Sequence, residues 1–327
     1  MTEVLYRLGH ELLRVHHVVP PLTLGFATGV LLPGVLPRSP WAHRAPRLAV
    51  AVWSVLALAF TASVSLTVLQ LLLPVAASHR LADLAQICVL SGDVSSVPLL
   101  WRSLENLSAR AWVDLGAAAA VPAAFVGALV HRLLHGRRRR TRHARVLRLV
   151  GSRRPELRAT VLPLDVPTVY CLPGRAPQVV VSSGALEVLT ERQLAAALEH
   201  ERAHITGRHH LLVAATGAFS AVFRGVPLAR RLGTEVPLLL EMAADDRALR
   251  RCSPQALATA MYTVAAGQAP HSAFAAGGPS AVVRVQRILT PCVLGRPRLR
   301  TVLVSLVVVT ALFVPMVACC SVPGLDG

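Results

Sequence analysis

The sequence predicts an α-helical membrane protein with about four transmembrane helices and one α+β domain placed before the last of them. The composition gives the first indication. Of the 327 residues, 54% are hydrophobic and only 16% are charged, whereas a soluble domain carries about 25% charged residues. The second indication is the distribution of the apolar residues, which gather in long runs without charges. This composition argues against a purely cytosolic enzyme and excludes a disordered chain.

Four hydrophobic runs are candidate membrane spans, because a helix needs about 20 mostly apolar residues to cross the hydrocarbon core. The second and fourth runs are the clearest, since neither contains a charge. The first contains four prolines, which predicts a kinked or shortened helix, and the third is rich in Ala. Either of these two weaker runs could be a buried core helix instead. The expected spans are about 18–37, 48–75, 111–134 and 301–325.

The charges of the connecting loops predict the orientation, since short Arg-rich loops stay in the cytoplasm. The loop 38–47 carries three Arg and no acid, and seven Arg lie between residues 137 and 148, directly after the third span. The loop 79–110 has balanced charges. We therefore expect a multi-pass protein of a bacterial cell membrane. Its expected parts are an N-terminal membrane region (1–136), a cytoplasmic domain (137–298) and a C-terminal transmembrane helix with a short tail (299–327).

The Arg-rich cluster at 137–148 has two interpretations. It is either an anchor that contacts anionic lipid headgroups or a patch that binds nucleic acid. Its position after a membrane span favours the lipid, and no aromatic residue that could stack on a base is interleaved with it. The expected partners are the lipid bilayer and a protein or peptide substrate, with no direct binding of nucleic acid.

Within the region 137–298, the periodicity changes to that of a small α+β domain. Three short β-prone runs, separated by Pro and Gly, predict the strands of a small sheet at 159–164, 168–172 and 178–182. The last of these strands could pair with an extended substrate. A helix is expected to follow, with Thr190 as its N-cap, Gln193 completing a capping box and Gly207 at its end.

That helix contains the pattern His-Glu-x-x-His at residues 200–204. His200 and His204 are four residues apart, so both project from one face of the helix and can bind the same Zn²⁺ ion. Glu201 stands between them and is placed to take a proton from an attacking water. The alternative is a surface helix whose imidazoles make ordinary hydrogen bonds.

A third zinc ligand is expected from a later helix. After a second hydrophobic helix at 211–222, Glu241 and Asp245 lie one turn apart on one helical face, and Pro237 suits the first turn of their helix. Glu241 would complete a site of three protein ligands, and Asp245 would orient a ligating imidazole. Arg247 or a histidine of the cleft could stabilise the negative charge that develops on the substrate. Two solvated surface carboxylates are the alternative.

Four other histidines are weaker candidates. His131 and His135 are four residues apart at the end of the third span, but no acid lies near them in the sequence. His209 and His210 adjoin the metal motif. They could line the cleft, although a solvated loop is the favoured interpretation.

The run HERAHITGRHH, followed by EMAADDRAL, resembles the M56 membrane metallopeptidases, the BlaR1/MecR1 group of antibiotic-sensing proteases. The resemblance covers essentially the whole chain, and VVVSSGAL before the helix is similar to the strand and turn of the related M48 peptidases. It implies a gluzincin-type zinc metallopeptidase with His200, His204 and Glu241 as ligands and Glu201 as general base. Asp245 would be the carboxylate that orients a ligating imidazole. Only a few residues follow the fourth span, so the C-terminal penicillin-binding sensor domain of that group is expected to be absent.

The resemblance also implies a function. The expected protein is a zinc metalloendopeptidase that acts on the cytoplasmic side, in regulatory proteolysis of a BlaI-like, winged-helix transcriptional repressor. One alternative is a housekeeping membrane protease of the M48 type, which would share every active-site residue. The other is a non-proteolytic membrane scaffold with a structural zinc. Glu201 argues against the scaffold, because a structural zinc is closed by four ligands and needs no base.

Reporter fusions test the predicted orientation. A reporter fused after residue 145 should behave as cytoplasmic, and one fused at residue 90 as extracytoplasmic, because the loop charges alternate along the chain. A surface-exposed signal at position 145 would reverse the orientation and place the metal motif outside the cell.

Overall fold

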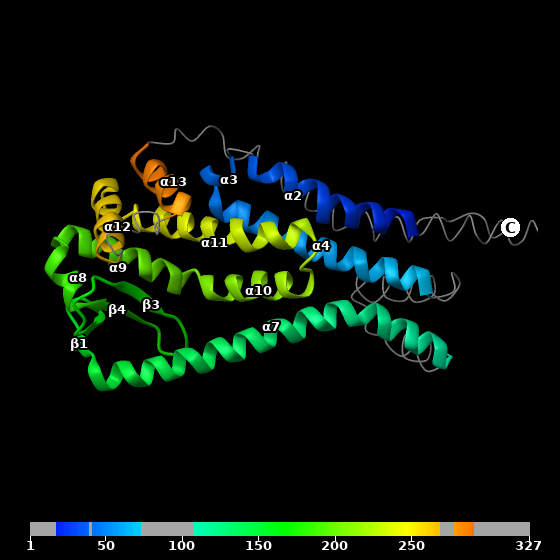
Figure 1. Cartoon of the computed structure of the whole chain (residues 1–327), viewed down its shortest axis with the longest axis horizontal. Helices are drawn as coiled ribbons and strands as arrows, with labels where there is room; N and C mark the ends of the chain where they lie inside the picture. Colours follow the sequence, from blue (N-terminus) through cyan, green and yellow to red (C-terminus); the bar gives the residue numbers. More distant parts are fainter. Residues whose placement is uncertain (1–17, 39–40, 73–107, 269–277, 291–327) are drawn as a thin grey trace, which may run out of the picture.

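The computed structural model describes residues 18–38, 41–72, 108–268 and 278–290. It is mostly helical, with long helices that run side by side and a small sheet at one end of them (Figure 1). Three helices are long and apolar enough to cross a membrane: Val18–Val35, Pro46–Leu72 and Ala109–Val150. They coincide with the first three predicted spans. The fourth predicted span, 301–325, lies outside the described residues.

The first of these helices is irregular, as its prolines predict. The π-helical turn η1 (Ala27–Leu31) passes into α2 (Leu32–Val35), which has a proline in its first turn, and then into the 3-10 turn η2 (Leu36–Arg38). The short helix α3 (Trp41–Arg44) then leads into α4 (Pro46–Leu72). Only α4 is a long and regular helix in this part of the chain.

Helix α7 (Ala109–Val150) has 42 residues, which corresponds to a length of roughly 63 Å. Its first turn is capped by Ser108, whose hydroxyl accepts a hydrogen bond from the backbone N–H of Ala111. The helix runs past the apolar segment and through the whole Arg-rich cluster without a break. The expected boundary between residues 136 and 137 therefore falls inside α7, and the division of the chain into domains stays a prediction.

The sheet has four strands in the order β1-β2-β4-β3. Their bounds are Ser152–Arg154 for β1, Ala159–Leu162 for β2, Val169–Leu172 for β3 and Gln178–Ser182 for β4. The sequence predicts the last three strands and misses β1, which is a short, polar and exposed segment. Strand β4 pairs with β2 in parallel and with β3 in antiparallel orientation. The expectation that segment 178–182 pairs with a substrate is therefore wrong, because both edges of β4 are already hydrogen-bonded.

Helix α9 (Glu191–Thr206) begins as the sequence predicts. The side chain of Thr190 accepts a hydrogen bond from the backbone N–H of Gln193, and the side chain of Gln193 accepts one from the backbone N–H of Thr190. The helix ends at Gly207, where a Cβ atom would overlap the ring of His209. Glycine at this position therefore allows the next helix to start close to the end of α9.

The remaining helices are α8 (Ser183–Val188), α10 (His209–Val222), α11 (Pro227–Ala248), α12 (Pro254–Gln268) and α13 (Gly278–Leu289). Pro227 stands in the first turn of α11, and Pro237 lies inside the helix. The assignment of Pro237 to the first turn is therefore wrong. Buried apolar side chains on both sides of Pro237 pack in one core with α4, and this packing outweighs the hydrogen bond that the proline removes.

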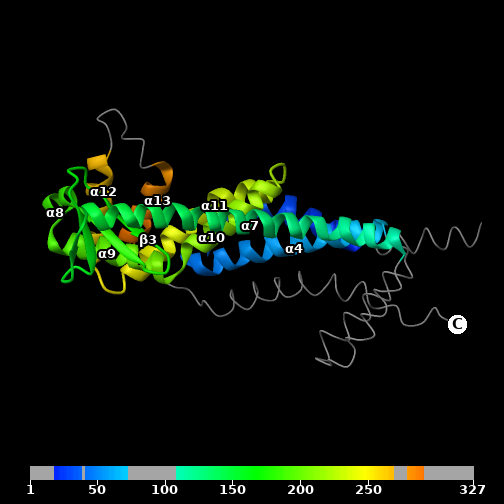
Figure 2. The same ribbon diagram turned by 90° about the horizontal axis from the view of Figure 1, so that it is seen from below.

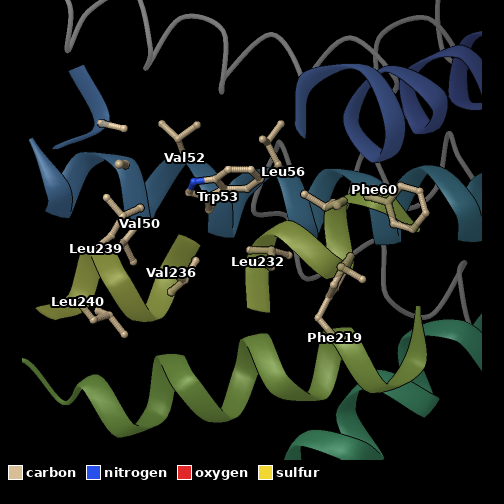
Figure 3. Close-up of a cluster of buried hydrophobic side chains, with 14 of the residues drawn as sticks. Val50, Val52, Trp53, Leu56, Phe60, Phe219, Leu232, Val236, Leu239 and Leu240 are labelled. Atoms are coloured by element: carbon tan, nitrogen blue, oxygen red, sulfur yellow. The ribbon is translucent and has the colours of Figure 1, made fainter. Parts of the chain in front are cut away.

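The largest hydrophobic core joins α4 to α10 and α11. Trp53, Leu56 and Phe60 of α4 lie against Leu232 and Val236 of α11 (Figure 3). The α10–α11 pair follows the third apolar helix in the sequence, yet it packs alongside α4 and α7, and both views show these helices running together (Figures 1 and 2). Helices α10 and α11 also pack against α9, so the core fixes the position of α11 relative to α9.

The cap of α9 gives a stability prediction. Thr190→Ala should lower the free energy of unfolding by about 1 kcal/mol, because it removes the side-chain acceptor at the N-terminus of the helix. Thr190→Ser keeps this acceptor and should retain most of the stability. Denaturant unfolding of the purified chain measures both variants. A Ser variant as unstable as the Ala variant would contradict the capping role.

Candidate metal centre

Two helices bring the three predicted zinc ligands together. His200 and His204 project from α9, and Glu241 projects from α11, which packs against it. The two Nε2 atoms are 3.2 Å apart, and each lies 3.4 Å from a carboxylate oxygen of Glu241. Within the described residues, these three side chains form the one group of His, Cys, Asp or Glu whose ligand atoms converge.

The spacing and chemistry of the three donor atoms fit a zinc ion. Zinc in tetrahedral sites bonds to imidazole nitrogen and carboxylate oxygen at about 2.0–2.2 Å, so two of its donor atoms lie roughly 3.3–3.6 Å apart. The separations of 3.2–3.4 Å agree with that value. Two imidazoles and one carboxylate are also the ligand set of hydrolytic zinc sites, which keep the fourth position for water.

Asp245 lies behind His200, as the sequence predicts. Its side chain is fully buried, and its Oδ1 atom lies 3.0 Å from the second ring nitrogen, Nδ1, of His200. The ring and the carboxylate are not aligned for a hydrogen bond. In the described part of the chain, Nδ1 of His200 has no other hydrogen-bond partner. A carboxylate at this place fixes the orientation of a metal-binding imidazole and makes Nε2 a better donor.

Arg284 of α13 neutralises the charge of both acids at this centre. Its Nε and Nη2 atoms donate to the two oxygens of Asp245 at 2.8 and 2.7 Å, and its Nη1 atom lies 2.9 Å from Glu241. The sequence does not identify this role of Arg284, and the suggestion that Arg247 stabilises the charge developing on the substrate stays a prediction. The available signal was weak: Arg284 interrupts the apolar run of α13, which indicates a buried partner but does not identify it.

The charges at the centre shift the pKa values of its groups. Burial opposes the ionised form of each group, but the contacts between them outweigh it. The pKa of His200 rises to about 9 because Asp245 and Glu241 stabilise its cation. The pKa of Glu241 lies well below its ordinary value, since His200, His204 and Arg284 stabilise the carboxylate. The pKa of Asp245 is also lowered, mainly by Arg284. Both acids are therefore ionised and available to bind or support a cation.

His209 is a second supporting residue, and it lines the groove as one of the two sequence-based interpretations allows. It is buried rather than solvated, so the favoured interpretation as a loop residue is wrong. Its Nδ1 atom lies 3.0 Å from Nδ1 of His204. Burial, followed by the charge of His204, lowers the pKa of His209 to about 4, so its ring is neutral at pH 7. When His204 binds a metal through Nε2, its Nδ1–H would donate to the unprotonated Nδ1 of His209.

Glu201 lies beside the three ligands but does not belong to their group. The thiol of Cys171, on the edge strand β3, is close to the Glu201 carboxylate. Burial and then the charge of Glu201 raise the pKa of Cys171 to about 12, so the thiol stays protonated. The strand next to the predicted general base is therefore β3, which the sequence reasoning did not connect with the site.

Comparison with known families supports a peptidase. Residues 137–234 match the family model of Peptidase family M48. The matching segment contains the sheet, α9 and α10, including His200, Glu201 and His204, and it ends before Glu241. The resemblance to the M56 family stays a prediction, since the match is to a related family. No solved structure matches the chain.

The buried ion pair at the centre gives a prediction for the metal-free protein. Arg284→Ala should lower the free energy of unfolding by about 3–5 kcal/mol, because it leaves the Asp245 carboxylate buried without its main partner. The control is Arg231→Ala, which removes a partly exposed pair with Glu235 at 3.9 Å and should cost at most about 1 kcal/mol. Denaturant unfolding in the presence of a chelator compares the two variants. Equal losses would contradict a structural role for the buried pair.

Proposed function

We propose that this chain is a membrane-anchored zinc metalloendopeptidase. The observation that carries the proposal is the convergence of His200, His204 and Glu241 at zinc-ligand spacing, with Glu201 next to them. The match to an M48 peptidase domain supports the same chemistry. Three apolar helices support the association with a membrane.

The chemistry requires one metal and one base. His200, His204 and Glu241 would hold the zinc ion, which when bound would act as a Lewis acid toward a water and the scissile carbonyl. Glu201 would take the proton from the attacking water. It would then return this proton to the leaving amine as the peptide C–N bond breaks.

The supporting residues would hold these groups in place. Asp245 would keep His200 in the tautomer that presents Nε2, and His209 would do the same for His204. Arg284 would keep both acids ionised and fix Glu241 against α13. An extended substrate could add to the free edge of β3, which passes next to Glu201 in the described part of the chain.

We propose a cytoplasmic catalytic side and, as the specific target, a BlaI-like, winged-helix repressor that is inactivated when it is cut. The Arg-rich end of α7, next to the sheet, supports the cytoplasmic side. The M48 match supports a housekeeping membrane protease equally well, so two targets compete. Comparing the proteomes of cells with the active protein and with Glu201→Gln separates them. Accumulation of an uncut cytosolic regulator supports the first target, and accumulation of membrane proteins alone supports the second.

Zinc binding and peptide hydrolysis should respond differently to substitutions at the metal centre. The purified protein should bind about one Zn²⁺ per chain, since three ligands define one site. His200→Ala, His204→Ala and Glu241→Ala should each lose the metal. Glu201→Gln should keep it and lose peptide hydrolysis, because only the base is removed. Asp245→Ala should weaken zinc affinity by about 10- to 100-fold.

Elemental analysis and a quenched-peptide assay on the same preparations measure these effects. Loss of zinc from Glu201→Gln would mean that this residue is a ligand. Full hydrolysis by Glu201→Gln would mean that another group is the base.

A further inference from the structure

A groove of about 1000 Å³ extends from the metal centre along α7. His204 and Glu241 line one part of it, and Cys171 of β3 lies at its side. The opposite wall is α7, and α10 forms the floor between them. Along α7, the lining runs from Gly127 to Arg140, a distance of roughly 20 Å at 1.5 Å per residue. An extended peptide of about six residues has this length.

The α7 wall of the groove is strongly basic. Arg132, Arg139 and Arg140 line it, together with His131 and His135, which are one turn apart. The guanidinium of Arg132 lies over Gly217 of α10, where a Cβ atom would come within 2.8 Å of it. The side chain of Arg132 therefore lies against α10. Arg140 is partly buried, whereas Arg132 and Arg139 are exposed at the groove wall.

The groove lacks acidic residues to balance these charges. Glu241 is the only acidic residue among the described lining residues. Its carboxylate already contacts the imidazoles of His200 and His204 and the guanidinium of Arg284. The ion pairs found in the described part of the chain involve other arginines: Arg154, Arg202, Arg231, Arg251, Arg284 and Arg287. Three unpaired cations beside a hydrolytic centre favour a ligand that carries negative charge.

The position along α7 favours a peptide over a lipid headgroup as the source of that charge. Arg132 is the first charged residue after the apolar stretch of α7, and Arg140 follows eight residues later, about 12 Å further along the helix. The headgroup layer on each side of a bilayer is only about 5–8 Å thick. With α7 spanning the membrane, Arg139 and Arg140 lie beyond that layer. They line the same groove as His204 and Glu241 of the metal centre.

We propose that Arg139 and Arg140 are specificity-determining residues that select substrates with acidic side chains within about six residues of the scissile bond. This inference rests on the proposed peptidase function and names its substrate class. An Asp or Glu of the bound peptide would pair with a guanidinium of α7 while the scissile bond lies near Glu201. A neutral or basic segment would leave the arginines unpaired or repel them.

The experiment uses zinc-loaded, full-length protein in neutral detergent. A peptide library with mass-spectrometric readout identifies cleaved sites, and pairs of synthetic peptides then differ only in Asp or Asn near the cut. The measured quantity is the ratio of kcat/KM for the acidic over the neutral peptide. We expect a ratio of about ten or more, which the double variant Arg139→Glu/Arg140→Glu should reduce to about one or below.

The control is Arg138→Glu/Arg145→Glu, which makes the same charge change on a different face of α7. It should keep the wild-type ratio. An equal fall in the control, or a wild-type ratio near one, would overturn the inference. Loss of the ratio in nanodiscs with anionic lipid would overturn it too, because lipid would then occupy the arginines.

A binding measurement keeps the inference separate from the peptidase proposal. Fluorescent acidic and neutral peptides are titrated into Glu201→Gln protein, and anisotropy reports binding without turnover. Tighter binding of the acidic peptide, lost in the variant that also carries Arg139→Glu/Arg140→Glu, supports the groove even if catalysis is absent. Cleavage of all peptides with no charge preference would overturn this inference alone, whereas selective binding with no cleavage would overturn the proposed function.

Discussion

The structure depends on one fully buried carboxylate, that of Asp245. A buried charge is costly unless it is paired and hydrogen-bonded, and here the guanidinium of Arg284 donates to both of its oxygens while His200 lies on its other side. These contacts connect α9, α11 and α13, three helices that are far apart in the sequence. Glu241 stands one turn before Asp245 on α11 and receives the same guanidinium. The arrangement that stabilises the helix packing therefore also positions the ligands.

Helix α11 connects the metal centre to the apolar helices. Its first part packs with α4 in the largest core (Figure 3), and its last part carries Glu241 and Asp245. Interior packing is dense, so a displacement of α4 that repacks this core would be transmitted along α11. Helix α7 makes a second connection, because one unbroken helix carries both an apolar segment and the basic wall of the groove. The proposed active site thus packs directly against the long apolar helices.

The parts of the structure that follow from local sequence patterns are the ones that the sequence predicts. The capping box at Thr190, the spacing of His200 and His204, and the one-turn spacing of Glu241 and Asp245 all depend on neighbours within a few residues. The start of α11 was predicted too late, at Pro237. Packing against α4 stabilises the helix on both sides of this proline, and a local sequence pattern does not reveal that contact. Arg284 was missed for the same reason, since its role exists only once α13 packs against α11. His209 was offered as a residue that could line the cleft but was not favoured, although it lies only five residues from His204. The burial of β4 between two strands likewise depends on sheet order, which no single strand reveals.

In the proposed site, two imidazoles of α9 and one carboxylate of α11 hold a catalytic zinc ion. X-ray absorption at the zinc edge of the full-length protein measures this ligand set. We expect nitrogen and oxygen neighbours at about 2.0–2.2 Å, with the multiple scattering of two imidazoles and no sulfur. We also expect Glu241→Ala to change this spectrum. A sulfur shell at about 2.3 Å, or a spectrum unchanged by the loss of Glu241, would contradict the proposed ligand set.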